Sequence, residues 1–492
     1  MSTEIDKVSE GSVEDGPKND EIEDEDASVK KIPWYKFDNV AMSRGYCTLG
    51  IGRGALVMSN IFLSTSLIFL ASEEAGCLNE KGDEVSDDCD EKVYGFKPVS
   101  LISNIAIMTG VLSALFMPLA GAMIDYTSFR RQVGICVAVL MILIQAVQIY
   151  TVSSTWFAMA MLQALAGFLY QVQVLAVYAY LPEIATTVGQ QIMTQQTALF
   201  TMTQFGAQCL FLIVVIAISI ALGLDDVNTA QVSQGIDVVW TGSFFYWGWL
   251  LLPNVPPRHV LREGKLLITE GFSRVYHTAK EIQQHYKRGL RCYFVALIFA
   301  ESAVNAFTTV AVVFLDEQIG LSGTEIGLFF LVTLLFSLPG SKIGAFVTAR
   351  SNPNTSWQLC MLSLMLFASG GAIVLDYIPK SLSYLWGAGI GLHLGWFYPT
   401  ENLFFSMILP KDHEAELAGF YVYCTQILSW LPPLIFTILV EADVNQTYAV
   451  VAVSSFLLVS IFSLQCAAHW DEILEESGRS AGKKTEELDS TH

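Results

Sequence analysis

The feature that most constrains this chain is a stretch of 51 residues, 132–182, that contains no Asp, Glu, Lys or Arg. A helix that spans a bilayer needs roughly 20 predominantly apolar residues. The stretch therefore predicts two membrane spans joined by a hairpin near Ser153 and Ser154. Similar apolar runs fill most of the chain, which is 53% hydrophobic and only 15% charged. This composition excludes a soluble globular protein and predicts an all-α membrane protein.

The apolar runs predict twelve spans, six before the middle of the chain and six after it. The first six cover residues 50–71, 101–124, 132–152, 155–181, 198–223 and 238–253. The second six cover residues 292–315, 324–347, 356–375, 381–409, 417–440 and 446–468.

The polar segment 254–291 separates the two sets of spans and has the strongest basic bias, with eight Lys and Arg residues against three Glu residues. Lys and Arg close to membrane spans stay on the cytoplasmic side during insertion, so we place this segment and both termini in the cytosol. The predicted organisation follows from that choice. It consists of a disordered acidic tail over 1–33, a six-helix bundle over 34–253, a basic linker over 254–291, a second six-helix bundle over 292–470 and a tail over 471–492.

The loops assigned to the opposite side are acidic and contain few cations. Their acidic residues include Asp225, Asp226, Asp237, Asp316, Glu317, Glu441 and Asp443. The loop 72–98 on this side contains Cys77 and Cys89 and no other cysteine. Because that side is expected to be oxidising, we predict a disulfide between the two. Asn445 begins a glycosylation acceptor sequence beside the twelfth span, where the membrane hinders its use.

The two halves carry related sequences at matching points. Leu-Pro pairs at 181–182 and 409–410 end the fourth and tenth spans. Gly and a polar residue four positions later end the second span at 121–125 and the eighth at 344–348, each followed by Arg. Two parallel six-helix repeats joined by a long loop are the architecture of the major facilitator superfamily. We therefore predict that fold, with 12 transmembrane helices arranged as two six-helix bundles.

Four stretches resemble known members of this superfamily. Gly121 and Asp125 with Arg130 and Arg131 resemble its loop motif after the second span, which implies a gating role for these four residues. VYAYLPEIA at 177–185, FAESAVNAF at 299–307 and the passage 409–433 resemble the autophagy-related vacuole effluxer family. The resemblance covers about residues 34–470. It implies export of neutral amino acids from a vacuole.

Three charged residues lie deep within predicted spans of the second half. A charged side chain at the centre of a span costs roughly 2.5–3.5 kcal/mol on insertion scales, so it usually faces a cavity or a partner. Glu301 lies ten residues from Arg291, Lys342 eight residues before Arg350, and Glu401 nine residues before Pro410. At about 1.5 Å per residue all three lie ~12–15 Å from the cytosolic face, and we expect one polar cluster.

Other roles for two of these residues remain open. The Lys342 side chain can instead snorkel to the interface, and Glu401 can form a purely structural pair with Lys342. Glu301 is too deep for a short carboxylate to reach water except through a cavity, so we expect it to be the central ionisable residue. It is then a proton carrier, or a substrate clamp if Lys342 keeps it ionised.

Polar groups on spans one, four and seven are candidates for substrate binding. In span four, Gln163, Tyr170 and Gln171 share one helical face, and Asn60 lies in span one. Asn305 lies one turn beyond Glu301, so the pair can hold an ammonium group. Amides on such faces can equally join helices.

Two further patterns in the second half concern helix packing. Gly387, Gly391 and Gly395 recur every four residues and predict close packing of the tenth span against a neighbour. The Pro432-Pro433 pair predicts a kink in the eleventh span. Glu263 with Leu267 and Ile268 fits a sorting signal, but such a pattern is more typical of an amphipathic interfacial helix.

We conclude from the sequence that the chain is a secondary transporter that exports neutral amino acids from an acidic vacuole or lysosome-like lumen by alternating access. Protons are a candidate coupling ion, the partners are a small-molecule substrate and the lipid bilayer, and we expect a monomer. We expect no enzyme activity, no metal, no cofactor and no nucleic acid partner, because the sequence shows no matching motif. A plasma-membrane facilitator of another metabolite, a sensor and a scramblase remain alternatives.

Overall fold

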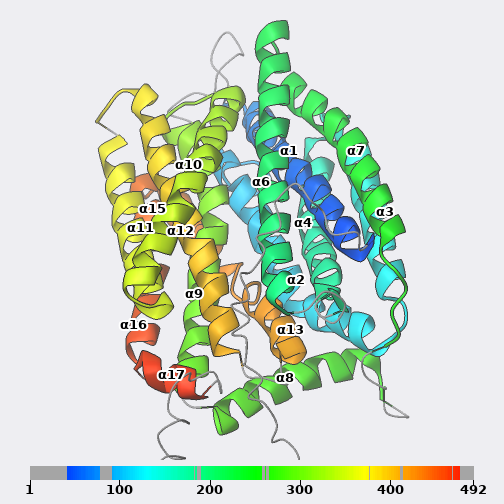
Figure 1. The fold of residues 1–492 in the computed structure, drawn as a ribbon. Helices are drawn as coiled ribbons and strands as arrows, with labels where there is room; N and C mark the ends of the chain where they lie inside the picture. Colours follow the sequence, from blue (N-terminus) through cyan, green and yellow to red (C-terminus); the bar gives the residue numbers. More distant parts are fainter. Residues whose placement is uncertain are drawn as a thin grey trace, which may run out of the picture. The chain divides into compact units, whose positions relative to one another are not determined.

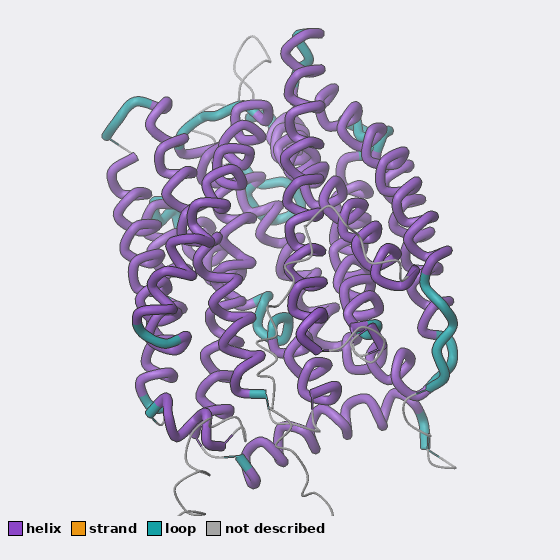
Figure 2. The backbone as a smooth tube through the Cα atoms, viewed as in Figure 1, coloured by secondary structure: helices purple, strands orange, loops and turns teal. Residues whose placement is uncertain are grey.

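The computed structural model of the chain describes residues 41–77, 91–181, 183–184, 190–257, 261, 265–286, 288–375, 377–409, 414–467 and 469–476. These residues form helices joined by short loops, without a β-strand in any of the described segments (Figures 1 and 2). The predicted acidic tail and Cys89 lie outside the described residues. The predicted all-α class is confirmed.

The first half of the chain contributes helices α1 (Ala41–Ala75), η1 (Pro98–Ser100), α2 (Leu101–Tyr126), α3 (Arg130–Gln148), α4 (Trp156–Tyr178), α6 (Gln190–Leu222) and α7 (Asp226–Leu251). Helix α8 (Leu267–His285) follows in the middle segment. The second half contributes α9 (Arg288–Val313), η2 (Phe314–Gln318), α10 (Gly323–Arg350), α11 (Pro353–Leu375), η3 (Lys380–Leu382), α12 (Ser383–Ile408), α13 (Glu414–Cys424), α14 (Leu431–Glu441), α15 (Gln446–Ser454), α16 (Phe456–Gln465) and α17 (Trp470–Glu476).

Nine helices among the described residues are long and apolar enough to cross a membrane. They include α1, α2, α3 and α4 in the first half and α9, α10 and α11 in the second. Exposed large apolar side chains are frequent on these helices, as expected where lipid replaces water as the surrounding medium. The structure is therefore that of a multi-pass integral membrane protein, and the number twelve remains a prediction.

One expected boundary is wrong. The apolar pattern predicts Asp237 in a loop, but the residue lies fully buried inside α7, which begins at Asp226. Asp225 caps this helix by accepting a hydrogen bond from Asn228 N at 2.7 Å. The search for apolar runs misses the start of α7 because this part of the helix is polar. Its polar side chains, such as Gln234, face the protein interior.

The middle segment contains a helix that lies across the lower ends of the others in Figure 1. Helix α8 has apolar and charged residues on opposite faces, which agrees with the expected amphipathic helix at this position. Its Gly271 packs so closely on α2 that an added Cβ would lie 2.3 Å from Pro118 O.

Helices α10 and α12 approach each other through glycine. An added Cβ at Gly391 would lie 2.1 Å from Thr333 O, and one at Gly395 would lie 1.9 Å from Ser337 O. On the facing helix, a Cβ at Gly340 would lie 2.2 Å from Leu392 O. Small residues allow such close backbone approach between membrane helices. The glycine repeat in the sequence therefore predicts this packing correctly.

The eleventh predicted span is broken in two. Residues 425–430 form turns between α13 and α14, and this interruption is drawn as loop in Figure 2. Pro432 and Pro433 lack the N–H groups that would continue an α-helix, and Leu431 N instead bonds to Leu428 O at 3.0 Å. Trp430 in the break packs against Gly110 of α2. The predicted kink is thus a discontinuity at mid-span.

The close packing of α10 on α12 can be tested at Gly391. Gly391→Ala is expected to destabilise the protein by about 1–3 kcal/mol because the added methyl overpacks the interface. Gly370→Ala in α11 is the control, because a Cβ there meets open space. Thermal unfolding in detergent should show a lower Tm for the first variant only, and equal Tm values would contradict the close approach.

Candidate transport site

Glu301 of α9 and Glu401 of α12 meet in the interior of the second half. Glu301 is 6% exposed and Glu401 is fully buried. Their carboxyl groups lie close enough to interact directly. An ionised carboxylate can only accept hydrogen bonds, so a hydrogen bond between the two groups would require a proton on one of them. The arrangement is a buried carboxyl pair.

Each member of the pair receives one further donor. Asn305 Nδ2 donates to Glu301 Oε2 at 3.1 Å, and the Tyr421 hydroxyl donates to Glu401 Oε1 at 2.5 Å. Asn305 is itself exposed, so the buried pair lies one helical turn from accessible surface. The expected contact between Asn305 and Glu301 is present.

Aromatic rings enclose the pair on the side of α13. The Tyr421 ring stacks on Phe405 with centroids 4.5 Å apart, and Phe405 stacks on Tyr293 at 5.9 Å. The buried Tyr293 hydroxyl lies within electrostatic range of both glutamates and has no hydrogen-bond partner among the described residues. A second hydroxyl is therefore available to the pair.

Lys342 does not join this cluster. Its side chain is exposed on α10 and forms no ion pair with Glu301 or Glu401 in the described structure. The expectation of a three-membered cluster is wrong here, because equal depth along two helices does not make two side chains face each other. The exposed position agrees with the alternative in which Lys342 reaches the interface.

A second buried charge, which the sequence patterns did not single out, lies in the first half. Arg53 of α1 is 4% exposed, and its Nη2 donates to the Tyr170 hydroxyl at 3.0 Å. Its guanidinium carbon lies 5.1 Å, 5.8 Å and 5.3 Å from the ring centroids of Tyr170, Tyr178 and Phe200. The available signal in the sequence is a single arginine between glycines inside the first predicted span.

Tyr398 of α12 is half-buried and interacts electrostatically with Glu301 and Glu401, and also with Tyr170 and Tyr178 of α4.

The other polar residues expected on spans one and four have mixed roles. Gln163 Nε2 donates to Ser64 Oγ at 3.0 Å and so joins α4 to α1. Asn60 Nδ2 donates to Leu56 O within its own helix at 3.0 Å. Gln171 is half-buried and forms no hydrogen bond with the described residues. Tyr170 is the one member of this set that touches a buried charge.

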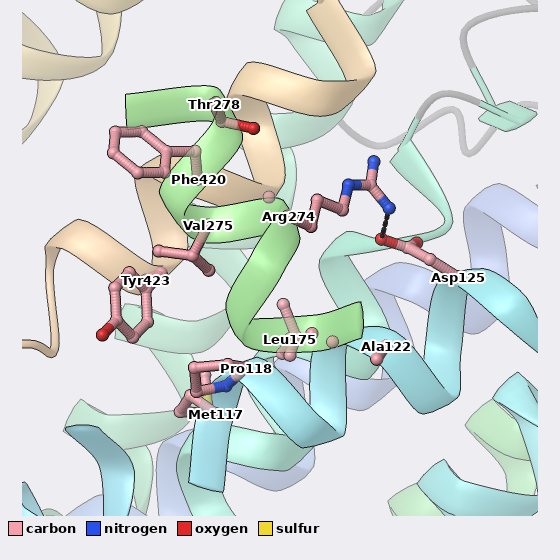
Figure 3. Close-up of a pocket in the computed structure, with 13 residues that line it drawn as sticks. Met117, Pro118, Ala122, Asp125, Leu175, Arg274, Val275, Thr278, Phe420 and Tyr423 are labelled. Carbon is pink, nitrogen blue, oxygen red and sulfur yellow. Dashed lines mark hydrogen bonds and ion pairs between the residues drawn. The ribbon is translucent and has the colours of Figure 1, made fainter. Parts of the chain in front are cut away.

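The motif expected to gate the pathway lies at the lower end of the helices and uses a partner from the middle segment. Asp125 Oδ2 pairs with Arg274 Nη1 of α8 at 2.8 Å (Figure 3). Gly121 and both members of this pair line a pocket between α2, α8 and α13. The sequence contains both residues but does not reveal the contact, because they lie 149 positions apart.

The two arginines of the motif bind other groups. Arg130 is almost fully buried and pairs with Glu183 at 2.6 Å, and it also donates to Ala179 O at 3.2 Å. Arg131 Nε donates to Trp249 O of α7 at 3.1 Å. These contacts fasten the start of α3 to the ends of α4 and α7.

Ion pairs connect the two halves of the chain at the upper end. Lys92 Nζ lies 2.9 Å from Glu441 Oε2, and Lys97 N donates to Glu441 Oε1 at 2.7 Å. Lys97 Nζ also pairs with Asp443, and this contact holds the pKa of the Asp443 carboxyl below its ordinary value. We call these contacts of Lys92, Lys97, Glu441 and Asp443 the upper clasp.

Cys77 is disulfide-bonded, whereas Cys136, Cys209, Cys292, Cys360, Cys424 and Cys466 are free. Cys89 lies outside the described residues. The pairing of Cys77 with Cys89 therefore remains a prediction.

The helical bundle has the fold of major facilitator superfamily transporters. The nucleoside transporter NupG has a similar fold, with 11% identity and a TM-score of 0.54 over 86% of this chain and 98% of that chain. The xylose transporter XylE from E. coli in an inward-open conformation has 12% identity and a TM-score of 0.56, over 88% and 98% of the chains.

Residues 39–469 match the family model described as "Vacuole effluxer Atg22 like", and the chain belongs to that family. The resemblance expected from the sequence is thereby confirmed. An uncharacterized MFS-type transporter, YxiO of Bacillus subtilis (strain 168), is 20% identical over 240 residues, which are 48% of this chain and 53% of YxiO. The chain thus spans about half the length of this curated relative.

The contact between Asp125 and Arg274 predicts a charge-swap result. Arg274→Asp places two acids together and is expected to lower transport about threefold to tenfold, and Asp125→Arg should do the same. The double variant restores the attraction and should recover most of the activity. Uptake by reconstituted vesicles measures all three.

Lys280→Asp is the matched control for this swap, because Lys280 is an exposed cation on the same helix. Transport by the control should stay within about twofold of wild type. If the double variant is as weak as the worse single variant, the pair does not act through its charges.

The upper clasp predicts a small stability effect with a defined pH dependence. Because folding lowers the pKa of Asp443, its contribution is complete above the ordinary aspartate pKa of about 4 and is lost as pH falls through the lower value. Asp443→Asn should lower the Tm by a few degrees at most at about pH 7. The backbone at Asp443 has φ of 58°, which Asn also tolerates, so the variant changes the charge alone.

The measurement is thermal unfolding of both proteins between about pH 7 and pH 3. The difference in Tm should persist at about pH 5 and shrink progressively as the pH falls below about 4. A difference that is independent of pH would show that the ion pair contributes nothing.

Proposed function

We propose that this protein exports neutral amino acids from an acidic vacuole or lysosome-like lumen to the cytosol, with a proton carried by Glu301 and Glu401. The observation that carries the proposal is the contact between their two buried carboxyl groups. Two buried carboxylates in contact repel each other, which favours a proton on one of them. We expect the pair to hold one proton and to lose or gain another as its surroundings change.

The pair favours the proton-carrier role of Glu301 over the substrate-clamp role. A clamp requires a cation such as Lys342 to keep the carboxylate ionised, and Lys342 is exposed on another face. The donors that contact the pair, Asn305 and Tyr421, are neutral. They stabilise a negative charge on the pair, but they do not keep the pair ionised as a cation would.

The pH difference between an acidic lumen and the cytosol sets the direction of transport. When the pathway opens to the lumen, the carboxyl pair takes up a proton and a solute binds. When the pathway opens to the near-neutral cytosol, the proton leaves and the solute follows. The vacuole and the word effluxer in the family description support this compartment and this direction.

Substitution of the pair tests this function. Glu301→Gln and Glu401→Gln keep hydrogen bonding but remove one titrating group, so gradient-driven leucine efflux from acid-loaded vesicles should fall at least about tenfold. Exchange of labelled for unlabelled leucine at equal pH needs no net proton movement and should stay within about threefold of wild type.

Two control variants accompany this test. Glu74→Gln changes an exposed carboxyl near the end of α1, and Lys342→Gln changes the exposed lysine. Both should transport like wild type. Loss of exchange together with net efflux in the Glu301 variant would make it a clamp, and normal transport at every pH would make the pair structural.

A further inference from the structure

Arg53 is a buried cation with no carboxylate partner. Its side chain is 4% exposed, and no ion pair is formed by it in the described structure. Nη2 donates to Tyr170, but Nε and Nη1 are buried and have no hydrogen-bond partner. Three donor N–H bonds on these two atoms are therefore unused.

The aromatic neighbours of Arg53 compensate only part of this cost. Cation–π contacts stabilise the guanidinium charge, and Tyr170, Tyr178 and Phe200 supply three of them. Rings stabilise the positive charge but accept no N–H bond in the guanidinium plane. The unused donors are therefore still without an acceptor in the described structure.

The burial of Arg53 excludes an ordinary interfacial role. Its side chain is 4% exposed, and its guanidinium lies against the rings of Tyr170, Tyr178 and Phe200. The side chain therefore does not snorkel to the interface. A buried charge within a membrane helix usually faces a partner or a cavity.

We infer that Arg53 is the binding site for the carboxylate group of the transported solute. Guanidinium binds carboxylate through two parallel N–H bonds, and this geometry is specific to Arg. Such a pair of parallel N–H bonds comes from Nη2 together with either Nε or Nη1. Tyr170 takes one N–H of Nη2, so the second N–H of Nη2 and the unused donor beside it remain for a carboxylate. Tyr170 holds the guanidinium in place through Nη2 and so acts as a positioning residue.

The inference rests on the proposed function and assigns different roles to the two halves of the chain. The first half supplies one fixed positive charge, and the second half supplies the carboxyl pair that carries the proton. A zwitterion presents its carboxylate to Arg53, and its ammonium group points away from this cation. A carboxylate without an ammonium group would use Arg53 alone.

Three ligands of one carbon skeleton separate these contributions. Leucine carries both charges, 4-methylpentanoate only the carboxylate, and 3-methylbutylamine only the ammonium group. Isothermal titration calorimetry of the full-length protein measures each affinity. Arg53→Gln should weaken leucine and 4-methylpentanoate at least about tenfold and leave 3-methylbutylamine within about twofold of wild type.

Two further variants guard against a folding defect. Arg53→Lys keeps the charge and the cation–π contacts but loses the two parallel N–H donors of the guanidinium. It should therefore fold normally and bind both carboxylates at least about threefold more weakly. Arg44→Gln, nine residues earlier on α1 and exposed, is the matched control and should bind all three ligands like wild type.

The outcomes distinguish this site from the proposed function. If leucine binds and both Arg53 variants bind it like wild type, the site is overturned and the function stands. If 4-methylpentanoate binds through Arg53 but leucine does not, the site stands and amino-acid export is overturned. If wild type binds neither carboxylate, or if Arg53→Gln weakens all three ligands equally, the carboxylate site is overturned.

Discussion

The contact between the buried carboxyl groups of Glu301 and Glu401 is the constraint on which the second half depends. A charge enclosed in apolar surroundings is strongly disfavoured unless it is paired or neutralised. A proton on one of the two groups reduces the charge of the pair, and the donors Asn305 and Tyr421 stabilise the charge that remains. Helices α9, α12 and α13 each contribute a member of this cluster.

Arg53 solves the same physical problem in the other half by a different route. It has no proton to lose at any physiological pH, so it cannot neutralise itself as the glutamates can. Three aromatic rings and one phenol oxygen stabilise it instead. With the carboxyl pair singly protonated, these groups together hold one positive and one negative charge. A zwitterionic solute then adds no net charge, whereas an anion or a cation alone does.

The sequence predicts the fold more completely than the site. Apolar runs locate the long helices because the thickness of the bilayer sets the length of a spanning helix. The glycine repeat at 387–395 predicts a backbone contact because a row of glycines on one helix face allows a neighbouring helix to approach closely. The depth of a residue along a helix can also be predicted from the sequence, and Glu301 and Glu401 are correctly predicted at one level. The direction in which a side chain faces cannot be predicted in this way, and for this reason the expectation that Lys342 joins the cluster is wrong.

Contacts between distant segments are the other limit. Asp125 and Arg274 are each conspicuous, but nothing in the local sequence pairs a residue of α2 with one of α8. Asp237 is misplaced because α7 is polar on its buried face, which an apolar scan interprets as a loop. Arg53 escapes notice because one charge hardly lowers the mean hydropathy of a 35-residue helix.

Helix α13 joins the carboxyl pair to the lower end of the molecule. The break at 425–430 separates this helix from α14, whose last residue, Glu441, belongs to the upper clasp. Tyr421 on α13 donates to Glu401, while Phe420 and Tyr423 line the pocket that contains Asp125 and Arg274 (Figure 3). A hydrogen bond to an ionised carboxylate is roughly twice as strong as one to a neutral group. The strength of the bond from Tyr421 therefore depends on the charge of Glu401, and the helix that carries Tyr421 also lines the pocket of the Asp125–Arg274 pair.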